Sequence, residues 1–135
     1  MNKELDVLTR TLWGEARGEP TKGVIAVAWT IKNRANKPCW WGNSIESVCL
    51  KKYQFSCWNS NDPNYPFLSG KKPIPTKDYV RLQESAVAVI DGHELDPTYG
   101  ATHYYAKSMR NPPVWTKGAK MTTVIGNHIF YKDVP

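Results

Sequence analysis

The residues best suited to chemistry lie in one short stretch, Leu12 to Pro20, which holds two carboxylates, two glycines and a proline. Leu5, Leu8 and Leu12 recur at spacings of three and four, which predicts an amphipathic helix. Glu15 follows at the same spacing, so its carboxyl group continues the apolar face of that helix. Burial raises the pKa of a carboxylic acid, because the charged form loses its hydration. A raised pKa suits a general acid that works near neutral pH.

A structural account of Glu15 stands beside this one. A buried glutamate can instead pair with an arginine or accept hydrogen bonds from backbone amides, and such structural pairs also perturb pKa values. Glu19 lies four residues on, but Gly18 and Pro20 turn the chain between the two acids. Gly18 is predicted to adopt the left-handed conformation that ends many helices. We therefore interpret Glu19 as a partner of backbone donors in the loop or in the next helix.

Five blocks, in order along the chain, carry a family resemblance. They are Trp13 to Pro20, Gly23 to Arg34, Lys52 to Trp58, Asp96 to Tyr105 and Ile125 to Tyr131. Together they resemble the cell wall hydrolase family of the spore-cortex-lytic type, in register over nearly the whole chain. The resemblance implies an enzyme that cuts peptidoglycan glycan strands between N-acetylmuramic acid and N-acetylglucosamine.

The family is similar to the lytic transglycosylases, which implies one catalytic glutamate, here Glu15. The acid would protonate the leaving oxygen and then accept the proton of the sugar's own 6-hydroxyl, which closes a 1,6-anhydro ring. A lysozyme-type muramidase, with Glu19 or Asp62 as a second carboxylate, is the alternative within the same class. An alternative of another class is a non-catalytic basic module that binds envelope polymer or nucleic acid.

The resemblance also implies residues that support the acid. Gln54 and Ser56 are expected to hydrogen-bond the N-acetyl group or the cationic sugar. Tyr104 or Tyr105 is expected to orient Glu15 or to line the cleft, and only one can do so because side chains alternate along a strand. The candidate substrate-binding or supporting residues are Glu19, Gln54, Phe55, Ser56, Trp58, Tyr104 and Tyr105. Asn33 and Arg34 are interpreted as braces of the first two helices.

The elements that position these residues follow from periodicity and punctuation. Long helices are predicted over residues 3–17, from the turn at 18–22 to Asn36, and from Thr76 as N-cap to Gly92. Asn43 and Glu46 have the spacing of a capping box for a short helix to Leu50. Strands are predicted over 101–106, 121–125 and 128–132, with a Gly126-Asn127 hairpin turn.

These elements predict an α+β fold, which is a mainly helical, lysozyme- or transglycosylase-like domain with a small antiparallel sheet near the C-terminus. Residues 1–135 are expected to form a single catalytic domain. The proline-punctuated run over residues 59–75 is expected to form a wall or lid of the cleft, or else a passive connection.

Composition limits the partners. The net charge is +6, which favours an anionic cell envelope as a partner or simply indicates a solvated basic surface. The basic residues are scattered, so no nucleic-acid partner is expected. No apolar run approaches the roughly 20 residues that cross a bilayer. We expect a monomer that binds peptidoglycan glycan strands.

Cysteine and histidine spacing indicates no cofactor. The three cysteines form no disulfide framework, and the three histidines lack metal-ligand spacing, so neither a metal nor another cofactor is expected. The N-terminus does not resemble a signal peptide. We therefore expect a phage-type endolysin, made in the host cytoplasm without a signal peptide and acting on the cell wall after release.

Overall fold

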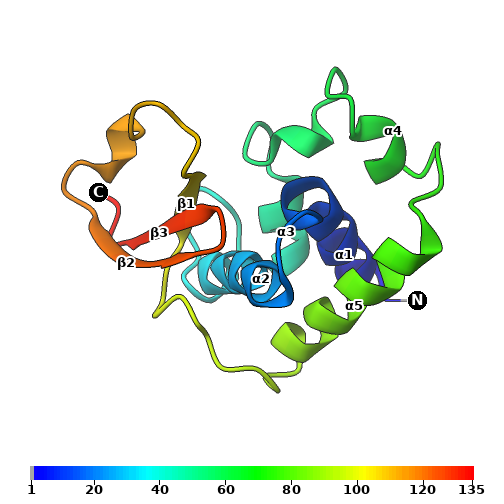
Figure 1. Ribbon diagram of the computed structural model, residues 1–135, viewed down its shortest axis with the longest axis horizontal. Coiled ribbons are helices and arrows are strands. Elements are labelled where there is room, and N and C mark those ends of the chain that lie inside the picture. The colour runs from blue at the N-terminus through cyan, green and yellow to red at the C-terminus, as the bar shows by residue number, and fades with distance from the viewer. Residues whose placement is uncertain (1) are drawn as a thin grey trace.

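The computed structural model describes residues 2–135, which form a helical part and a smaller sheet part joined along α2 (Figure 1). The α-helices are α1 Lys3–Ala16, α2 Thr21–Asn36, α3 Ile45–Leu50, α4 Tyr65–Leu68 and α5 Thr76–Ile90. Two 3-10 helices are η1 Ser56–Trp58 and η2 Val114–Thr116, and the strands are β1 His103–Ala106, β2 Lys120–Ile125 and β3 His128–Lys132. The α+β prediction is confirmed.

Helix α1 is the centre of the helical part and packs against α2, α3 and α5. Its N-cap is Asn2, whose side chain accepts hydrogen bonds from the backbone N–H groups of Glu4 and Leu5. Leu8 and Leu12, on its apolar face, are fully buried. Burial of each such side chain contributes on the order of 1.5–3 kcal/mol, so this face fixes the orientation of α1 and of Glu15 at its end.

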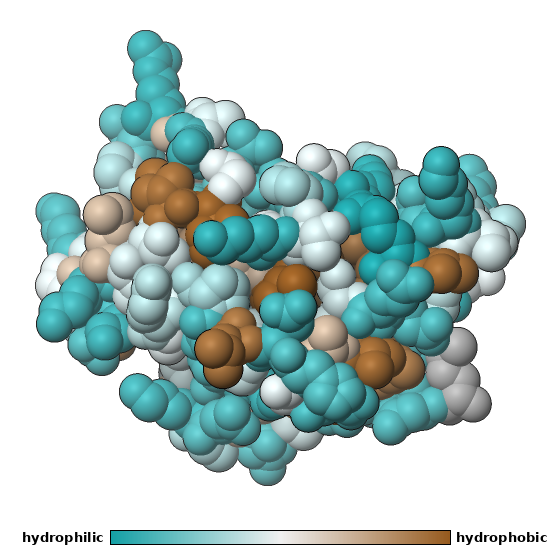
Figure 2. Space-filling view, turned by 60° about the horizontal axis from the view of Figure 1, so that its bottom comes forward, coloured by the Kyte–Doolittle hydropathy of each residue, from teal (hydrophilic) through white to brown (hydrophobic). Residues whose placement is uncertain are grey.

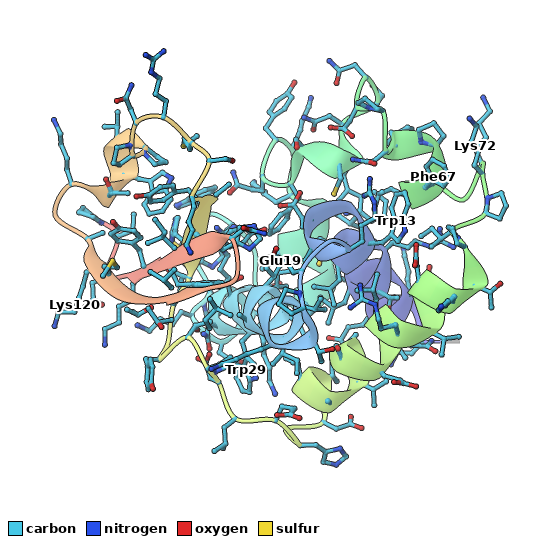
Figure 3. The ribbon with its side chains drawn as sticks, viewed as in Figure 1. Trp13, Glu19, Trp29, Phe67, Lys72 and Lys120 are labelled. Carbon is cyan, nitrogen blue, oxygen red and sulfur yellow. The ribbon has the colours of Figure 1, made fainter. Side chains whose placement is uncertain are left out.

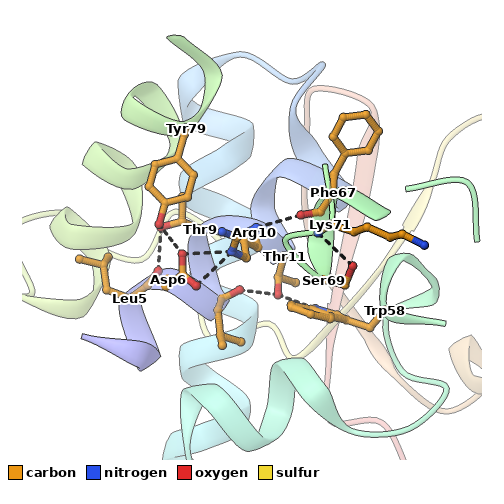
Figure 4. Close-up of polar contacts among 11 residues, drawn as sticks. Leu5, Asp6, Thr9, Arg10, Thr11, Trp58, Phe67, Ser69, Lys71 and Tyr79 are labelled. Atoms are coloured by element: carbon orange, nitrogen blue, oxygen red, sulfur yellow. Dashed lines mark hydrogen bonds and ion pairs between the residues drawn. The ribbon is translucent and has the colours of Figure 1, made fainter. Parts of the chain in front are cut away.

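A polar network ties α1 to its neighbours at the opposite end from Glu15. Arg10 Nε donates to both carboxylate oxygens of Asp6, at 3.1 and 3.0 Å, and Arg10 Nη1 donates to the carbonyl oxygen of Phe67 at 2.8 Å (Figure 4). The Tyr79 hydroxyl of α5 also donates to Asp6. The ring of Phe67 packs against that of Trp13 at a tilt, with ring centroids 4.8 Å apart; both residues are labelled in Figure 3. The segment over residues 59–75 is therefore packed on α1.

The sheet has the order β1-β3-β2 with antiparallel pairing throughout. Gly126 turns the chain between β2 and β3 with a φ of 57°, as the predicted hairpin requires. Phe130 on β3 is fully buried and packs with Ala26 of α2, which attaches the sheet to that helix.

Three local predictions were wrong, and one short helix was not predicted. Gly18 is not left-handed, because Arg17 ends α1 in a right-handed conformation and the Glu19 N–H returns to the Ala16 carbonyl. The capping box before α3 lies one residue later, at Ser44 and Ser47. Helix α5 begins at Thr76 itself, with Pro75 as N-cap. The run over 59–75 holds the short helix α4, whose four residues are too few for a visible apolar period.

Asn33 and Arg34 do not brace the first two helices. Asn33 Nδ2 donates to Asp96 Oδ2 and to the carbonyl oxygen of Ala101, both at 2.9 Å. Arg34 Nε donates to the carbonyl oxygen of Thr102 at 2.6 Å. Both side chains join α2 to the segment that leads into β1, since α2 lies between the two parts of the molecule.

The surface carries no large apolar face on the side seen in Figure 2, where hydrophobic residues stand as separate small patches among hydrophilic ones. No helix within residues 2–135 combines the length and the apolarity needed to cross a membrane.

Candidate active site

Glu15 lies in the last turn of α1 and meets a residue of the sheet. The hydroxyl of Tyr104, on β1, donates a hydrogen bond of 2.7 Å to Glu15 Oε1. Glu15 is partly buried at this junction. The choice between Tyr104 and Tyr105 is thus made by the register of β1: Tyr104 faces the acid, and Tyr105 lies on the other face, stacked with Tyr131 at 5.9 Å.

A second donor reaches Glu15 from η1. The Cys57 thiol hydrogen-bonds the Glu15 carboxylate. This approach is possible because Gly14 precedes the acid: a Cβ at Gly14 would lie 2.6 Å from both Cβ and Sγ of Cys57. Sequence reasoning missed Cys57, although a glycine inside a helix is a signal of close approach by another segment.

The surroundings raise the pKa of Glu15. Burial is the largest cause, and the negative charge of Asp62 adds to it. The hydrogen bonds from Tyr104 and Cys57 and the positive charge of Arg34 act in the opposite direction, but they do not cancel the effect of burial. Burial and the neighbouring carboxylate also raise the pKa of Tyr104 far above its ordinary value, so its hydroxyl stays protonated and remains a donor. The protonated acid is therefore favoured at higher pH than for a free glutamate.

Arg34 is the buried cation near the acid. Besides its bond to Thr102, Arg34 Nη1 donates to Gln54 Oε1 at 3.4 Å. Its guanidinium carbon lies 5.5 Å from the ring centre of Trp41 and 5.6 Å from that of Phe55. An arginine near a helix end is normally a solvated residue, so its burial was not expected from the sequence.

The carboxylate of Glu19 is bonded to the turn between β2 and β3. Its side chain is buried, Oε1 accepts from the backbone N–H of Asn127 at 2.9 Å, and Oε2 accepts from the Asn127 side chain at 2.8 Å. His128 Nδ1 lies 3.4 Å from Oε1. Figure 3 shows Glu19 between the sheet and the helices. Burial would raise the pKa of Glu19, but the Asn127 donors and the charges of His128 and Lys107 outweigh it and lower the pKa.

Of the other predicted residues, some lie beside Arg34 near the acid, and others lie on η1, at the surface or against α1. Gln54 is partly buried beside Arg34, and Phe55 is buried beneath the same guanidinium. Ser56 is exposed at the start of η1. Trp58 Nε1 donates to Thr11 Oγ1 of α1 at 2.9 Å (Figure 4), which fixes η1 on the helix.

The linings of two pockets include residues next to the Glu15 site, but not Glu15 itself. The aromatic pocket, of about 590 Å³, is lined by Arg34, Gln54 and Tyr104 and by the rings of Trp40, Trp41, His103 and Trp115. The η1 pocket, of about 610 Å³, is lined by Tyr53, Trp58, Asn59 and neighbouring residues. Tyr104 lines the first, and Cys57 precedes Trp58, which lines the second. A third pocket, of about 590 Å³, lies around Asp6, Arg10 and Tyr79 and includes none of the predicted site residues in its lining.

The chain is similar to proteins of one family. A sequence model described as Cell Wall Hydrolase matches residues 18–131, a span that begins after Glu15. The spore cortex-lytic enzymes of Bacillus subtilis (strain 168) and Halalkalibacterium halodurans are each 30% identical over 96% of this chain. The chain spans only 37% and 34% of their lengths.

Two solved structures share the fold. The catalytic domain of the germination-specific lytic transglycosylase SleB from Bacillus anthracis matches with a TM-score of 0.72 at 24% identity, over 98% of this chain and 96% of that domain. The catalytic domain of the Bacillus cereus SleB protein matches with a TM-score of 0.71 at 25% identity, over 96% and 89%.

Proposed function

Because this chain belongs to the cell wall hydrolase family, we propose that it is an enzyme that cuts the glycan strands of peptidoglycan. The observation that carries the proposal is the position of Glu15, a partly buried acid bonded to Tyr104, which also lines the aromatic pocket. The name of the relatives, spore cortex-lytic enzyme, supports a cell wall substrate.

The proposed reaction is that of a lytic transglycosylase with one catalytic glutamate. Protonated Glu15 donates its proton to the glycosidic oxygen as the bond from that oxygen to C1 of N-acetylmuramic acid breaks. The carboxylate that remains is stabilised by the donors Tyr104 and Cys57 and by the charge of Arg34. It then accepts the proton of the 6-hydroxyl as that oxygen bonds to C1. The 1,6-anhydro ring forms, and Glu15 is protonated again.

A muramidase that uses water is the second candidate, and Asp62 is the observation that favours it. Asp62 lies close enough for its charge to raise the pKa of Glu15. A second carboxylate in that position resembles the pair that hydrolysing glycosidases use. Asp62 suits this role better than Glu19, because both oxygens of Glu19 are bonded to Asn127.

Mass spectrometry of a peptidoglycan digest tests both candidates. A lytic transglycosylase leaves 1,6-anhydro-muramic ends, whereas a muramidase leaves reducing ends. The reducing ends are about 18 Da heavier, because hydrolysis adds one water at each cut. Glu15→Gln is expected to abolish fragment release while the protein stays folded. Glu84→Gln, an exposed glutamate on α5, is the matched control. Full activity in Glu15→Gln would exclude the proposed role of the acid.

The non-catalytic alternative makes the opposite prediction, which is binding to cell walls without any released fragment in the wild-type chain.

The biological setting is a further proposal. A phage-type lysis role predicts that bacteria producing the chain lyse only after their membrane is permeabilised, and that Glu15→Gln removes this lysis.

A further inference from the structure

The aromatic pocket has a row of rings in its lining that the proposed reaction does not use. Three rings line it in a row: those of Trp41 and His103 lie 5.7 Å apart between centroids, and those of His103 and Trp115 lie 5.0 Å apart. Trp40 stands next to Trp41 at 5.7 Å and is 57% exposed. An indole that exposed leaves a flat apolar surface in water, which is unfavourable until something covers it.

The row is held in place before any ligand arrives. Trp41 Nε1 donates to the carbonyl oxygens of Arg34 at 2.9 Å and Lys37 at 3.1 Å. His103 Nδ1 shares a 2.8 Å hydrogen bond with Thr102 Oγ1. Trp115 packs edge-on against Tyr131 at 5.4 Å. A preformed wall binds more tightly than one that must be ordered during binding.

Arg34 is the one charged side chain in the lining, which also includes the C-terminal residue Pro135. Burial, together with the charge of Arg34, lowers the pKa of His103 to about 4, so the imidazole is uncharged at neutral pH. The guanidinium of Arg34 is bonded to Thr102 and to Gln54. The lining side chains include no carboxylate. Such a pocket disfavours a charged ligand and suits a neutral one with flat apolar faces and amide groups.

We propose that the aromatic pocket binds one N-acetylated pyranose of the glycan strand, next to the bond that Glu15 cuts, with Trp40 and Trp115 as its stacking surfaces. The axial C–H groups of a pyranose form an apolar face that covers an indole, and the Gln54 amide lies within the same lining to meet the acetamido group. Tyr104 lines this pocket and bonds Glu15, so a sugar held there is placed beside the acid. The inference rests on the proposed function, because that function supplies the strand.

The test uses the full chain with Glu15→Gln, so that the sugar is not consumed. A soluble trimer of N-acetylglucosamine is titrated while the indole N–H signals are followed by NMR. We expect saturable shifts confined to Trp40, Trp41 and Trp115. Trp40→Ala and Trp115→Ala, each added to Glu15→Gln, are expected to weaken binding at least tenfold. Trp29→Ala is the matched control, because Trp29 does not line the aromatic pocket and its Nε1 donates to the carbonyl oxygen of Glu94 instead. Figure 3 shows the position of Trp29.

Two further arms define the ligand. A glucose trimer, which lacks acetamido groups, should bind at least tenfold more weakly. A trimer with a muramic acid unit shows whether the lactyl group is accepted. Unchanged affinity in Trp40→Ala and Trp115→Ala, or no binding of the acetylated trimer, would overturn the proposal. These outcomes can be distinguished from a failure of the proposed function. If the wild type releases fragments while both tryptophan variants bind the trimer normally, only the pocket proposal is refuted. If the trimer binds as expected but the wild type releases no fragments, only the proposed reaction is refuted.

Discussion

The hydroxyl of Tyr104 donates a 2.7 Å hydrogen bond to Oε1 of Glu15, although 89 positions separate the two residues in the sequence. The acid is presented by a helix and its donor by a strand of the other part of the molecule. Their contact therefore depends on how the sheet is attached to α2, and the following predictions test both the contact and its supports.

Tyr104→Phe is expected to move the pH profile of glycan cutting. The hydroxyl stabilises the ionised form of Glu15, so its loss raises the pKa of the acid further. A general acid works while it is protonated, so the basic limb of kcat/KM should shift to higher pH. The maximal rate should fall, by roughly up to 100-fold, because the acid is less well oriented. Tyr105→Phe should leave the limb where it is, and an unshifted limb in Tyr104→Phe would contradict the assignment.

Gly14→Ala is expected to destabilise the protein even though alanine favours helices by about 1 kcal/mol. The added Cβ would lie 2.6 Å from Cys57, and such overpacking typically costs about 1–3 kcal/mol. Gly18→Ala is the control, since nothing lies within 4 Å of its Cβ and its φ is not positive. Urea denaturation compares the two variants, and equal stability would show that η1 can move away from α1 without cost.

Glu19→Gln is expected to lower stability at neutral pH and much less in acid. Because the folded-state pKa of Glu19 is below its ordinary value of 4.5, the ionised side chain contributes stability above pH 4.5, and this contribution is lost as the pH falls through the lowered pKa. The loss at neutral pH should be about 1.5–3 kcal/mol, the range for hydrogen bonds to a charged group. Urea denaturation across the pH range measures it, with Glu84→Gln as control. A difference that persists unchanged in acid would rule out the charge as the cause.

Charge reversal at the two lysine doublets should have different effects. Lys52 lines the η1 pocket, so Lys51→Glu with Lys52→Glu should slow the cutting of both intact walls and short neutral fragments. Lys72 lies over the ring of Phe67, and neither Lys71 nor Lys72 lines the aromatic pocket or the η1 pocket. Reversal there should slow only the lysis of intact walls.

Added salt should reproduce the effect of reversal at Lys71 and Lys72, since exposed charges are screened beyond about 10 Å at 0.1 M. Turnover of neutral fragments by the wild type should change much less. Equal inhibition of both substrates by reversal at Lys71 and Lys72 would show that the charge of this doublet acts within the cleft.

The helices could be predicted because their signals are local. Leu8 and Leu12 mark the buried face of α1 through their spacing, and the same spacing places Glu15 on that face. The predicted helix ends were less accurate. Gly18 was expected to be left-handed and is not, because Pro20 prevents the helix from continuing but does not determine which turn the chain makes before it. Local patterns therefore located the acid better than the loop that follows it.

The surroundings of the acid could not be predicted, because they depend on how distant segments meet. Alternation along β1 makes Tyr104 and Tyr105 equivalent until the sheet docks on α2. Arg34 was interpreted as a brace, since its burial arises only when β1 covers it. The aromatic pocket joins Trp41, His103 and Trp115, which no spacing rule relates.

The clamp between Glu19 and Asn127 has a consequence for the order of folding. It spans 108 positions, and the bond between Tyr104 and Glu15 spans 89. Contacts between such distant residues form late, because the entropy of closing a long loop must be overcome first. Helix α1 can therefore form early while its acid still lacks a donor, and glycan cutting during refolding should appear only when the hairpin has docked. The recovery of enzyme activity during refolding would then report the rate of the last folding step.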